Sequence, residues 1–325
     1  MMNREIIIIT GAAGFIGSVL LKYLNNKGIK EIICVDHLIG EKWKNLYGKK
    51  FIDYIEKDEF LKLIQDNKLP ENIKTIIHLG ACTSTIEKDT NYMIRNNFLY
   101  TKTLAEYCFL KNIYLIYASS AATYGNGENG FSDEEEKIFS LRPLNIYGFS
   151  KHLFDIMVVS NSEWRRKFCG LKFFNVYGPN EYHKGEMRSV INKMYYQIKK
   201  EGKVYLFKSY REDYKDGQQK RDFVYVKDVA SVIYFFLENR KTGIYNVGTG
   251  KAESFNKVAE VLFSLMGKDE KIEYIEMPLS IRKNYQYFTQ ADISKLRKAG
   301  YKEKFHSIKE GISDYIKFLE SSAYF

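Results

Sequence analysis

Short apolar runs alternate with amphipathic stretches along most of the chain. Residues 6–9 are four consecutive isoleucines, and residues 31–36, 74–79 and 113–118 are similar runs. Runs of this length and kind are typical of strands buried on both faces. Helical spacing of apolar residues lies between them, at 18–24, 58–66, 91–110 and 145–160. The alternation predicts an α/β fold, a doubly wound parallel sheet.

The pattern changes after Gly178–Pro179, where loops become longer and more polar. The loop at 208–221 carries charges of both signs, as expected of a lobe that binds a polar substrate. Further strands are predicted at 171–174, 221–226 and 243–247, and further helices at 229–239, 254–266 and 291–298. We therefore expect a dinucleotide-binding domain at 1–174, to which about 222–247 returns. A smaller mixed α/β substrate-binding lobe is expected at about 175–221 and 248–325.

A glycine-rich turn follows the first predicted strand. Gly11 permits the tight turn, Gly14 lets the backbone approach a pyrophosphate, and Gly17 allows close helix packing. The next strand ends in Asp36, at the distance where a carboxylate holds the adenosine ribose. A plain strand-to-helix turn is the alternative. With the strand, the helix and Asp36 all in place, the sequence predicts a Rossmann-like dinucleotide-binding fold.

Tyr147 and Lys151 lie four residues apart in a predicted helix. This spacing places both side chains on one helix face. Free tyrosine has a pKa of about 10, and a neighbouring ammonium lowers that value. The pair therefore predicts a proton acceptor for a substrate hydroxyl. A solvated helix face is the alternative, because both residue types are abundant here.

Composition indicates a soluble enzyme. The chain has 325 residues, and no apolar run in it approaches the length of a membrane span. Its four cysteines are widely spaced without a Cys-x-x-Cys motif, so we expect free thiols in a reducing cytoplasm and no metal site. The net charge of +10 comes from scattered lysines, which favours a phosphate-rich ligand over nucleic acid.

Several motifs in the expected order resemble the extended short-chain dehydrogenase/reductase superfamily. They are Gly11-x-x-Gly14-x-x-Gly17, Tyr117-Ala-Ser-Ser-Ala-Ala-Thr-Tyr-Gly125, Tyr147-x-x-x-Lys151 and Phe174-Asn-Val-Tyr-Gly-Pro179. A second set is similar to the ADP-L-glycero-D-manno-heptose 6-epimerase family within it. That set is His78-Leu-Gly-Ala-Cys-Thr-Ser-Thr85, His183-Lys-Gly185, Lys220-Arg-Asp-Phe-Val-Tyr-Val226, Gly248-Thr-Gly-Lys-Ala-Glu-Ser-Phe255 and Tyr285-Gln-Tyr-Phe-Thr-Gln-Ala-Asp292.

The resemblance implies inversion of the heptose carbon bearing the 6''-hydroxyl, through a transient ketone and with no net redox change. Inversion needs proton transfer on two faces of the substrate. Tyr147 is expected to serve one face and Lys184 the other, while a loop lysine that only contacts phosphate is the alternative for Lys184. Lys151 is expected to contact the nicotinamide ribose and lower the Tyr147 pKa, and Ser120 to hydrogen-bond the reacting oxygen.

The resemblance also implies the cofactor and substrate contacts. The expected cofactor-binding residues are Gly11, Gly14, Phe15, Ile16, Gly17, Asp36, His37, Lys42, Lys57, Leu79, Gly80, Ala81, Cys82, Thr83, Asn96, Lys151, Val176 and Lys184. The expected substrate-binding residues are Ser120, Asn175, Glu186, Lys193, Phe207, Arg221 and Tyr285. A salt bridge to a nearby aspartate is the alternative for Arg221.

NADP is the expected cofactor, with NAD as the alternative. Asp36 by itself favours NAD because a carboxylate repels a 2'-phosphate, but Lys42 and Lys57 match lysines that compensate in the family. His37 replaces the family's usual asparagine, and the loop around Lys42 is slightly short. The expected partner is a small ADP-heptose, with no nucleic acid and no membrane. The resemblance further implies a homo-oligomer, a pentamer, in the cytoplasm.

Two other functions are left open. Another sugar-nucleotide epimerase or dehydratase of the superfamily is one. A dehydratase usually has acidic residues beside the serine, whereas Ala121 and Ala122 follow Ser120 here. The other is a sensor that binds NADP without catalysis, which has no need of a Tyr147 and Lys151 pair.

Overall fold

The computed structural model describes residues 5–282 and 285–325. Its centre is a parallel sheet of seven strands in the order β10-β6-β5-β4-β1-β2-β3. The strands are β1 (Ile6–Thr10), β2 (Ile32–Asp36), β3 (Asp53–Glu56), β4 (Ile73–His78), β5 (Tyr114–Ser120), β6 (Phe168–Phe173) and β10 (Gly243–Val247). The predicted doubly wound sheet is confirmed. Order reverses between β1 and β4, where such sheets place their ligands.

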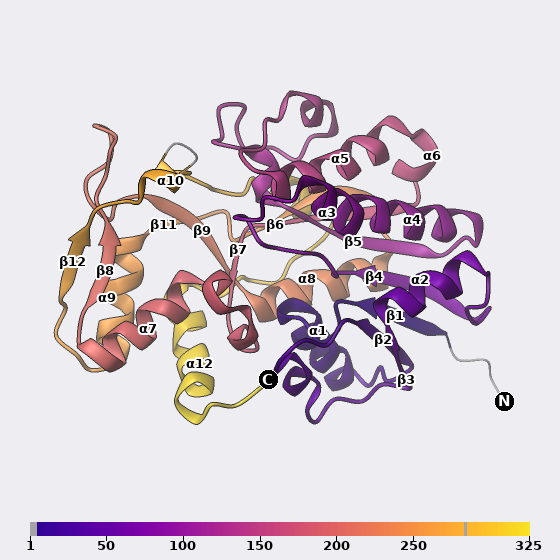
Figure 1. Ribbon diagram of the computed structural model, residues 1–325, viewed down its shortest axis with the longest axis horizontal. Helices are drawn as coiled ribbons and strands as arrows, with labels where there is room; N and C mark the ends of the chain where they lie inside the picture. Colours follow the sequence, from indigo (N-terminus) through magenta and orange to yellow (C-terminus); the bar gives the residue numbers. More distant parts are fainter. Residues whose placement is uncertain (1–4, 283–284) are drawn as a thin grey trace.

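Helices cover both faces of this sheet (Figure 1). Those on one face are α1 (Phe15–Asn26) and α8 (Val226–Asn239), and those on the other are α2 (Lys57–Gln65), α4 (Tyr100–Leu110) and α5 (Ile146–Ser160). Ile7 and Ile9 of β1 belong to one buried cluster, and Ile6 and Ile8 to the other. Since successive side chains of a strand point to opposite faces, this strand has to be apolar throughout.

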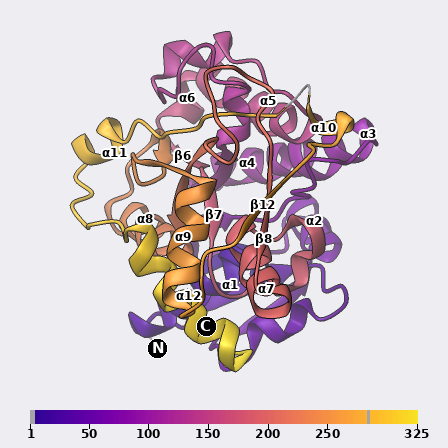
Figure 2. The same cartoon turned by 90° about the vertical axis from the view of Figure 1, so that its left-hand side faces the viewer.

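Two small sheets form the rest of the fold. One has three strands, β7 (Asn175–Tyr177), β9 (Lys220–Tyr225) and β11 (Ala252–Ser254), and the other pairs β8 (Val204–Phe207) with β12 (Ile272–Ile275). Figure 2 shows the helices that accompany them, α7 (Val190–Glu201), α9 (Phe255–Leu265) and α12 (Ile308–Ser321). Within the segment 222–247, therefore, β10 is a strand of the large sheet and α8 packs on that sheet, whereas β9 is a strand of a small sheet.

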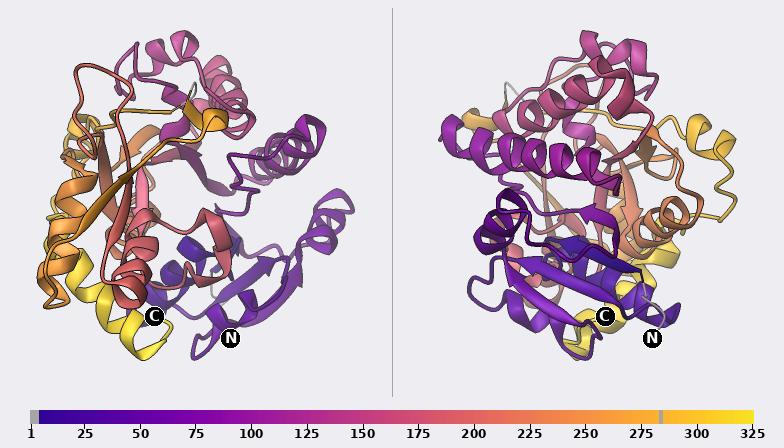
Figure 3. Two further views of the ribbon diagram at one scale, coloured as in Figure 1. Left: turned by 60° about the vertical axis from the view of Figure 1, so that its left-hand side comes forward. Right: turned by 90° about the vertical axis from the view of Figure 1, so that its right-hand side faces the viewer.

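The predicted helix at 91–110 is interrupted. It consists of α3 (Thr90–Met93), the π-helical segment η2 (Ile94–Leu99) and α4. In the π-helical segment, Asn97 is buried and bonds both the amide and the carbonyl of Cys82. A π-helical turn is a common feature of functional sites. Here it directs the Asn97 amide at the loop that leaves β4. The right-hand view in Figure 3 shows the helices of this segment beside the strands.

Short elements complete the chain. They are α6 (Ser162–Arg165), α10 (Leu279–Arg282), α11 (Ser294–Lys298), η1 (Lys42–Leu46), η3 (Ala121–Tyr124), η4 (Glu135–Ser140) and η5 (Tyr182–Met187). Sequence reasoning missed β3, β8 and β12, which are four residues long and include partly buried residues; β3 and β12 also contain charged residues that interrupt the apolar pattern. It also missed α7 and α12, and it made the helix at 291–298 too long.

No helix among the described residues is long and apolar enough to cross a membrane. The same residues contain no cluster of histidine, cysteine, aspartate and glutamate able to hold a metal ion. Cys34, Cys108 and Cys169 are buried free thiols and Cys82 is partly buried, as the spacing predicted.

Replacing Gly17 by alanine is predicted to abolish retention of a dinucleotide. A Cβ atom there would lie 2.1 Å from the Gly11 carbonyl oxygen, so α1 cannot keep its place against the turn. Gly28→Ala is the control, because Gly28 has a φ of +86° but open space around it. Both variants should lose stability, by about 1–3 kcal/mol. Only Gly17→Ala should purify without bound dinucleotide, as measured by absorbance and mass spectrometry. Equal retention in both would contradict this role of Gly17.

Candidate active site

A cavity of about 400 Å³ opens at the carboxyl ends of the parallel strands. It contains all four predicted catalytic residues, Ser120, Tyr147, Lys151 and Lys184. The predicted cofactor-binding and substrate-binding residues that also line it are Phe15, Ile16, Leu79, Ala81, Thr83, Asn175, Val176 and Arg221. Residues more than two hundred positions apart in the chain thus line one space.

Helix α5 brings Tyr147 and Lys151 to this cavity. Its N-terminus is capped by Asn145, whose side-chain oxygen accepts a hydrogen bond from the Gly148 amide at 2.8 Å. Gly148 approaches the Ala122 carbonyl so closely that a Cβ atom would lie 2.7 Å from its oxygen. The first turn of α5 therefore packs directly on the segment that follows Ser120, and Tyr147 and Ser120 come together.

Burial dominates the electrostatics of the tyrosine and lysine pair. It raises the pKa of Tyr147, against a hydrogen bond from Ser120 that lowers it. Burial also lowers the pKa of Lys151 to about 8, although the nearby Asp155 opposes this. The expected lowering of the Tyr147 pKa is therefore wrong for this structure, since removal of the phenol from water outweighs the favourable contacts of the phenolate.

Lys184 enters the cavity from the η5 segment. Its Nζ atom lies 5.6 Å from the centre of the Phe15 ring, and burial lowers its pKa while Glu181 raises it. Glu181 is itself buried and accepts bonds from the Ser189 hydroxyl at 2.7 Å and from the Tyr315 hydroxyl at 3.0 Å. These bonds fix the start of η5, and so they fix where Lys184 reaches the cavity.

The predicted dinucleotide turn has the geometry that a pyrophosphate needs. A Cβ atom at Gly11 would lie 2.7 Å from the Gly80 amide nitrogen, so the β1 and β4 loops meet here with no room for a side chain. Helix α1 lies wholly within the described residues, and its first turn carries no side-chain cap and no acidic residue. Its N-terminal amides are left for a ligand, and the helix dipole favours an anion at that end.

Asp36 lies at the end of β2, buried beside this turn. Its carboxylate accepts the amides of Ala13 and His37, both at 2.7 Å, and contacts the Lys42 ammonium. Lys42 thus balances the charge of Asp36 at the position expected for the adenosine ribose. Asn45, in the same η1 segment, donates to the Ala13 carbonyl at 2.9 Å and the Asn180 carbonyl at 3.1 Å. Asn45 therefore joins the cofactor side to the Lys184 side.

The remaining predicted cofactor contacts lie around this turn and not in the cavity lining. They are Gly11, Gly14, Gly17, Asp36, His37, Lys42, Lys57, Gly80, Cys82 and Asn96. Lys57 donates to the Asn96 side chain at 3.2 Å, and His37 lies 3.1 Å from the Glu56 carboxylate. Both contacts occur at the outer rim, where β2, β3 and α2 meet.

Arg221 is a buried cation on the substrate side. Its guanidinium bonds the backbone carbonyls of Lys220 and Gln286 and stacks on the Tyr285 ring at 5.3 Å. Within 5–282 and 285–325 it forms no ion pair, so the salt-bridge alternative is wrong there. The neighbouring Asp222 instead accepts three backbone amides and the Thr249 hydroxyl. Burial lowers the pKa of Arg221, which leaves a charge suited to a phosphate.

Four predicted substrate residues are not in the cavity lining, namely Glu186, Lys193, Phe207 and Tyr285. Glu186 and Lys193 form an ion pair at 3.2 Å, and the Glu186 side chain is 86% exposed. Phe207 and Tyr285 lie next to the cavity with ring centres 6.2 Å apart. Phe207 thus extends the aromatic surface around Arg221 without lining the cavity itself.

Several functional positions escaped the sequence reasoning. Arg188 lines the cavity, and Asn97 donates to Ser150 at 3.1 Å while Ser150 bonds the Tyr147 carbonyl. Arg188 lies three residues after the His183-Lys-Gly185 motif, and this position could have indicated that it lines the site. Asn97 is a polar residue on the inner face of a helical pattern, which is a usable signal, but the prediction chose its neighbour Asn96.

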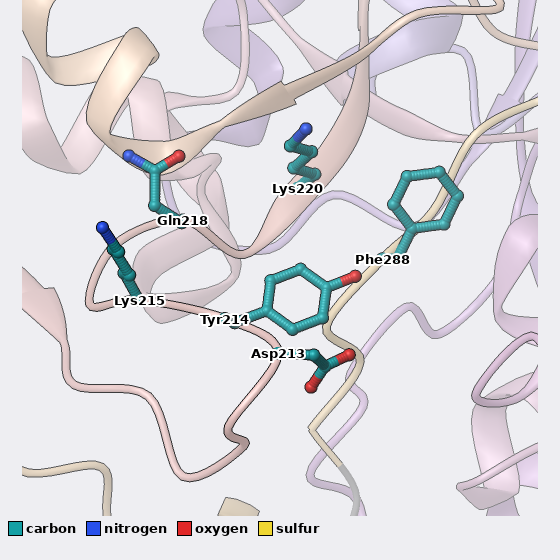
Figure 4. Close-up of a pocket in the computed structure, with 6 residues that line it drawn as sticks. All are labelled: Asp213, Tyr214, Lys215, Gln218, Lys220 and Phe288. Carbon is teal, nitrogen blue, oxygen red and sulfur yellow. The ribbon is translucent and has the colours of Figure 1, made fainter.

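A second cavity, of about 420 Å³, lies on the long loop before β9. Figure 4 shows its lining, Asp213, Tyr214, Lys215, Gln218, Lys220 and Phe288. None of the predicted catalytic or cofactor residues is among them. Lys220 and Arg221 are adjacent in β9 but line different cavities, as expected for successive residues of a strand. The predicted catalytic residues therefore all line the first cavity.

Comparison with known proteins decides the family. Residues 7–248 match the model of the NAD dependent epimerase/dehydratase family. An ADP-L-glycero-D-manno-heptose-6-epimerase of Fusobacterium nucleatum is 48% identical over 321 residues, which cover 96% of this chain and 97% of that protein. The chain belongs to the ADP-L-glycero-D-manno-heptose-6-epimerase family. Members of this family are isomerases by name.

Solved structures of heptose and hexose epimerases agree with this assignment. The ADP-L-glycero-D-manno-heptose-6-epimerase of Helicobacter pylori superposes with a TM-score of 0.83 and 29% identity, covering 98% of this chain and 97% of that one. A UDP-glucose 4-epimerase of Thermus thermophilus, solved as a complex with NAD, has a TM-score of 0.77 and 25% identity, with coverage of 98% and 99%. The Rossmann-like fold and the dependence on a nicotinamide dinucleotide are thus those of the family.

Arg221→Met is predicted to stabilise the ligand-free protein while removing its response to ADP. Loss of a buried, unpaired charge should raise the free energy of unfolding by about 1–2 kcal/mol. ADP should then no longer raise the unfolding temperature, because its phosphates lose their guanidinium. The control is Arg240→Met, whose exposed side chain lies over Tyr114 at the amino ends of the strands, away from the cavity. Unchanged stabilisation by ADP in the Arg221 variant would exclude this phosphate contact.

Proposed function

We propose that the protein converts ADP-D-glycero-β-D-manno-heptose to ADP-L-glycero-β-D-manno-heptose by inverting C6''. One observation carries the proposal. Tyr147 and Lys184 line the same cavity but come from different elements, α5 and η5, together with Ser120, Lys151 and Arg221. Such a cavity offers proton exchange from two directions. Inversion at a carbon that bears a hydroxyl requires this.

Each residue has a part that its position supports. A bound nicotinamide supplies reversible acceptance of the C6'' hydride. Tyr147 exchanges the hydroxyl proton on one face of the substrate, with Ser120 as a hydrogen-bond partner of the reacting oxygen. Lys184 exchanges the proton on the other face, and its lowered pKa makes the neutral amine more available near neutral pH than in an exposed lysine. Lys151 holds the nicotinamide ribose.

The charge of the cavity fits an ADP-sugar. Lys151 and Arg221 are buried cations and Lys184 is a partly buried one, and loss of water lowers the pKa of each. A diphosphate relieves the repulsion among such groups and replaces lost water. Arg221 contacts the phosphates, Tyr285 and Phe207 flank the nucleotide, and Asn175 contacts the sugar. Glu186 and Lys193 are left as rim contacts, because their ion pair points to solvent.

NADP is the proposed cofactor. Lys42 pairs with Asp36, and Lys57 lies nearby at the rim, so two ammonium groups are within reach of the position expected for the 2'-phosphate of the adenosine ribose. The enzyme works in the cytoplasm as a pentamer and supplies a precursor of the lipopolysaccharide core. Its dinucleotide-binding domain comprises 1–174 and about 222–247, and the remainder is the substrate-binding lobe.

The activity is tested by incubating purified protein with ADP-D-glycero-β-D-manno-heptose and following C6'' by NMR. Conversion to the L-glycero epimer is expected without added cofactor. Tyr147→Phe and Lys184→Met should each lower kcat by at least about 100-fold, because each removes one proton-exchanging group. Tyr205→Phe and Lys199→Met, on exposed surfaces, are the controls. No conversion, even with added NADP or NAD, would contradict the proposed substrate and favour an epimerase that acts on UDP-hexoses.

Cofactor choice is tested with Lys42→Met. Loss of this ammonium should weaken NADP binding about tenfold or more, since a 2'-phosphate then faces Asp36 alone. NAD binding should change little. Lys44→Met is the matched control in the same segment, because Lys44 pairs with Glu41 and not with Asp36. Titration of both dinucleotides by fluorescence measures the effect, and an equal loss for both would remove Lys42 from the selection of NADP.

A further inference from the structure

A fully buried ion pair lies beneath the active-site cavity. The Lys172 ammonium on β6 and the Asp155 carboxylate on α5 are 2.5 Å apart, and neither side chain is exposed to solvent. Lys172 is the only charged residue of β6, in the sequence Phe-Cys-Gly-Leu-Lys-Phe. Removing both charges from water is costly, so a pair like this requires complete hydrogen bonding to persist.

Asp155 uses its two oxygens to bind the preceding strand. One oxygen accepts from the Ser119 hydroxyl at 2.6 Å, and the other from the Tyr117 hydroxyl at 3.1 Å. Ser119 is next to Ser120 and lies opposite Lys172 in the pairing of β5 with β6. The carboxylate therefore fastens α5 to the last residues of β5.

Lys172 reaches Ser120 by a second route. Its ammonium donates to the Thr123 hydroxyl at 2.7 Å and lies over the Tyr124 ring at 5.2 Å. The Thr123 hydroxyl in turn donates to the Ser120 carbonyl at 2.8 Å. All of these groups are buried. The backbone of Ser120 is thus held by a chain of bonds that begins at Lys172.

The same helix carries the other reacting groups. Asp155 follows Lys151 by one turn and Tyr147 by two, so the three side chains share one face of α5. Rotation or sliding of α5 over β5 would separate Tyr147 from Ser120. The ion pair between Asp155 and Lys172 resists this movement. Neither residue lines the cavity, so the pair does not contact a ligand bound there.

We propose that Asp155, Lys172 and Thr123 are positioning residues that hold Ser120 in register with Tyr147 and Lys151. The inference rests on the proposed epimerisation. In that reaction Ser120 and Tyr147 act on the substrate oxygen, and Lys151 contacts the cofactor ribose. A displacement of about 1 Å at a reacting group can lower a rate about 100-fold, so such positioning has a kinetic signature separate from stability.

The experiment separates position from folding. Thr123→Val keeps the shape of the side chain but removes the hydroxyl between Lys172 and Ser120, and Thr123→Ser restores it. The double variant Asp155→Asn/Lys172→Met removes both buried charges at similar volume, so its unfolding temperature should stay near that of the unmodified protein. The control is Lys227→Met/Asp314→Asn, an ion pair of the same 2.5 Å separation that joins α8 to α12.

The expected result is a fall in kcat of about 10-fold or more for Thr123→Val and about 100-fold for the double variant, with KM little changed. Thr123→Ser and the control pair should retain the full rate. Full kcat in a folded double variant, or equal kcat for Thr123→Val and Thr123→Ser, would overturn the proposal.

Crystal structures of Thr123→Val and Thr123→Ser supply a readout that needs no substrate. The hydrogen bond between Ser120 and Tyr147 should be broken or lengthened in the valine variant and kept in the serine variant. An unmoved Ser120 in both would overturn the positioning role. If the unmodified protein fails to convert the ADP-heptose, the proposed function fails, and these structures still decide whether Thr123 holds Ser120.

Discussion

Burial of positive charge is the constraint on which the site depends. Lys151, Lys184 and Arg221 come from three separate segments and meet in one cavity, and for each of them burial lowers the pKa. A folded chain can hold such groups only where a rigid frame and a polyanionic ligand offset the loss of hydration. The same burial makes lysines into usable bases. We therefore propose that the same burial of cations both favours a negatively charged ligand and makes a lysine available for proton transfer.

The parallel sheet supplies the frame. The carboxyl ends of its strands place the loop after β1, the end of β5 and the start of β7 along one edge, and α5 packs against this edge through Gly148. Polar connections buried behind the edge then set finer positions. Glu181 anchors the segment of Lys184, and Asp155 with Lys172 joins α5 to β5. Rigidity therefore comes from buried hydrogen bonds as much as from apolar packing.

Much of this could be predicted from the sequence, and the exceptions have physical reasons. The four isoleucines of β1 and the turn from Gly11 to Gly17 are local patterns, so the strand and the dinucleotide turn could be recognised. The raised pKa of Tyr147 depends on how deeply tertiary packing buries it, which spacing to Lys151 does not reveal. The exposure of Glu186 could not be read from its position in a motif. Half-exposed strands such as β3 and β12 lack the apolar run that marks β1.

The most direct test of the account is to run the epimerisation in deuterated water and measure deuterium at C6'' of the product. In the proposed reaction, Tyr147 and Lys184 exchange protons at oxygen, while the carbon-bound hydrogen leaves and returns as a hydride that does not exchange with solvent. The account therefore predicts an L-glycero product with no deuterium at C6''. Incorporation of solvent deuterium at C6'' would show that a base removes the carbon-bound hydrogen as a proton, and it would contradict the central claim.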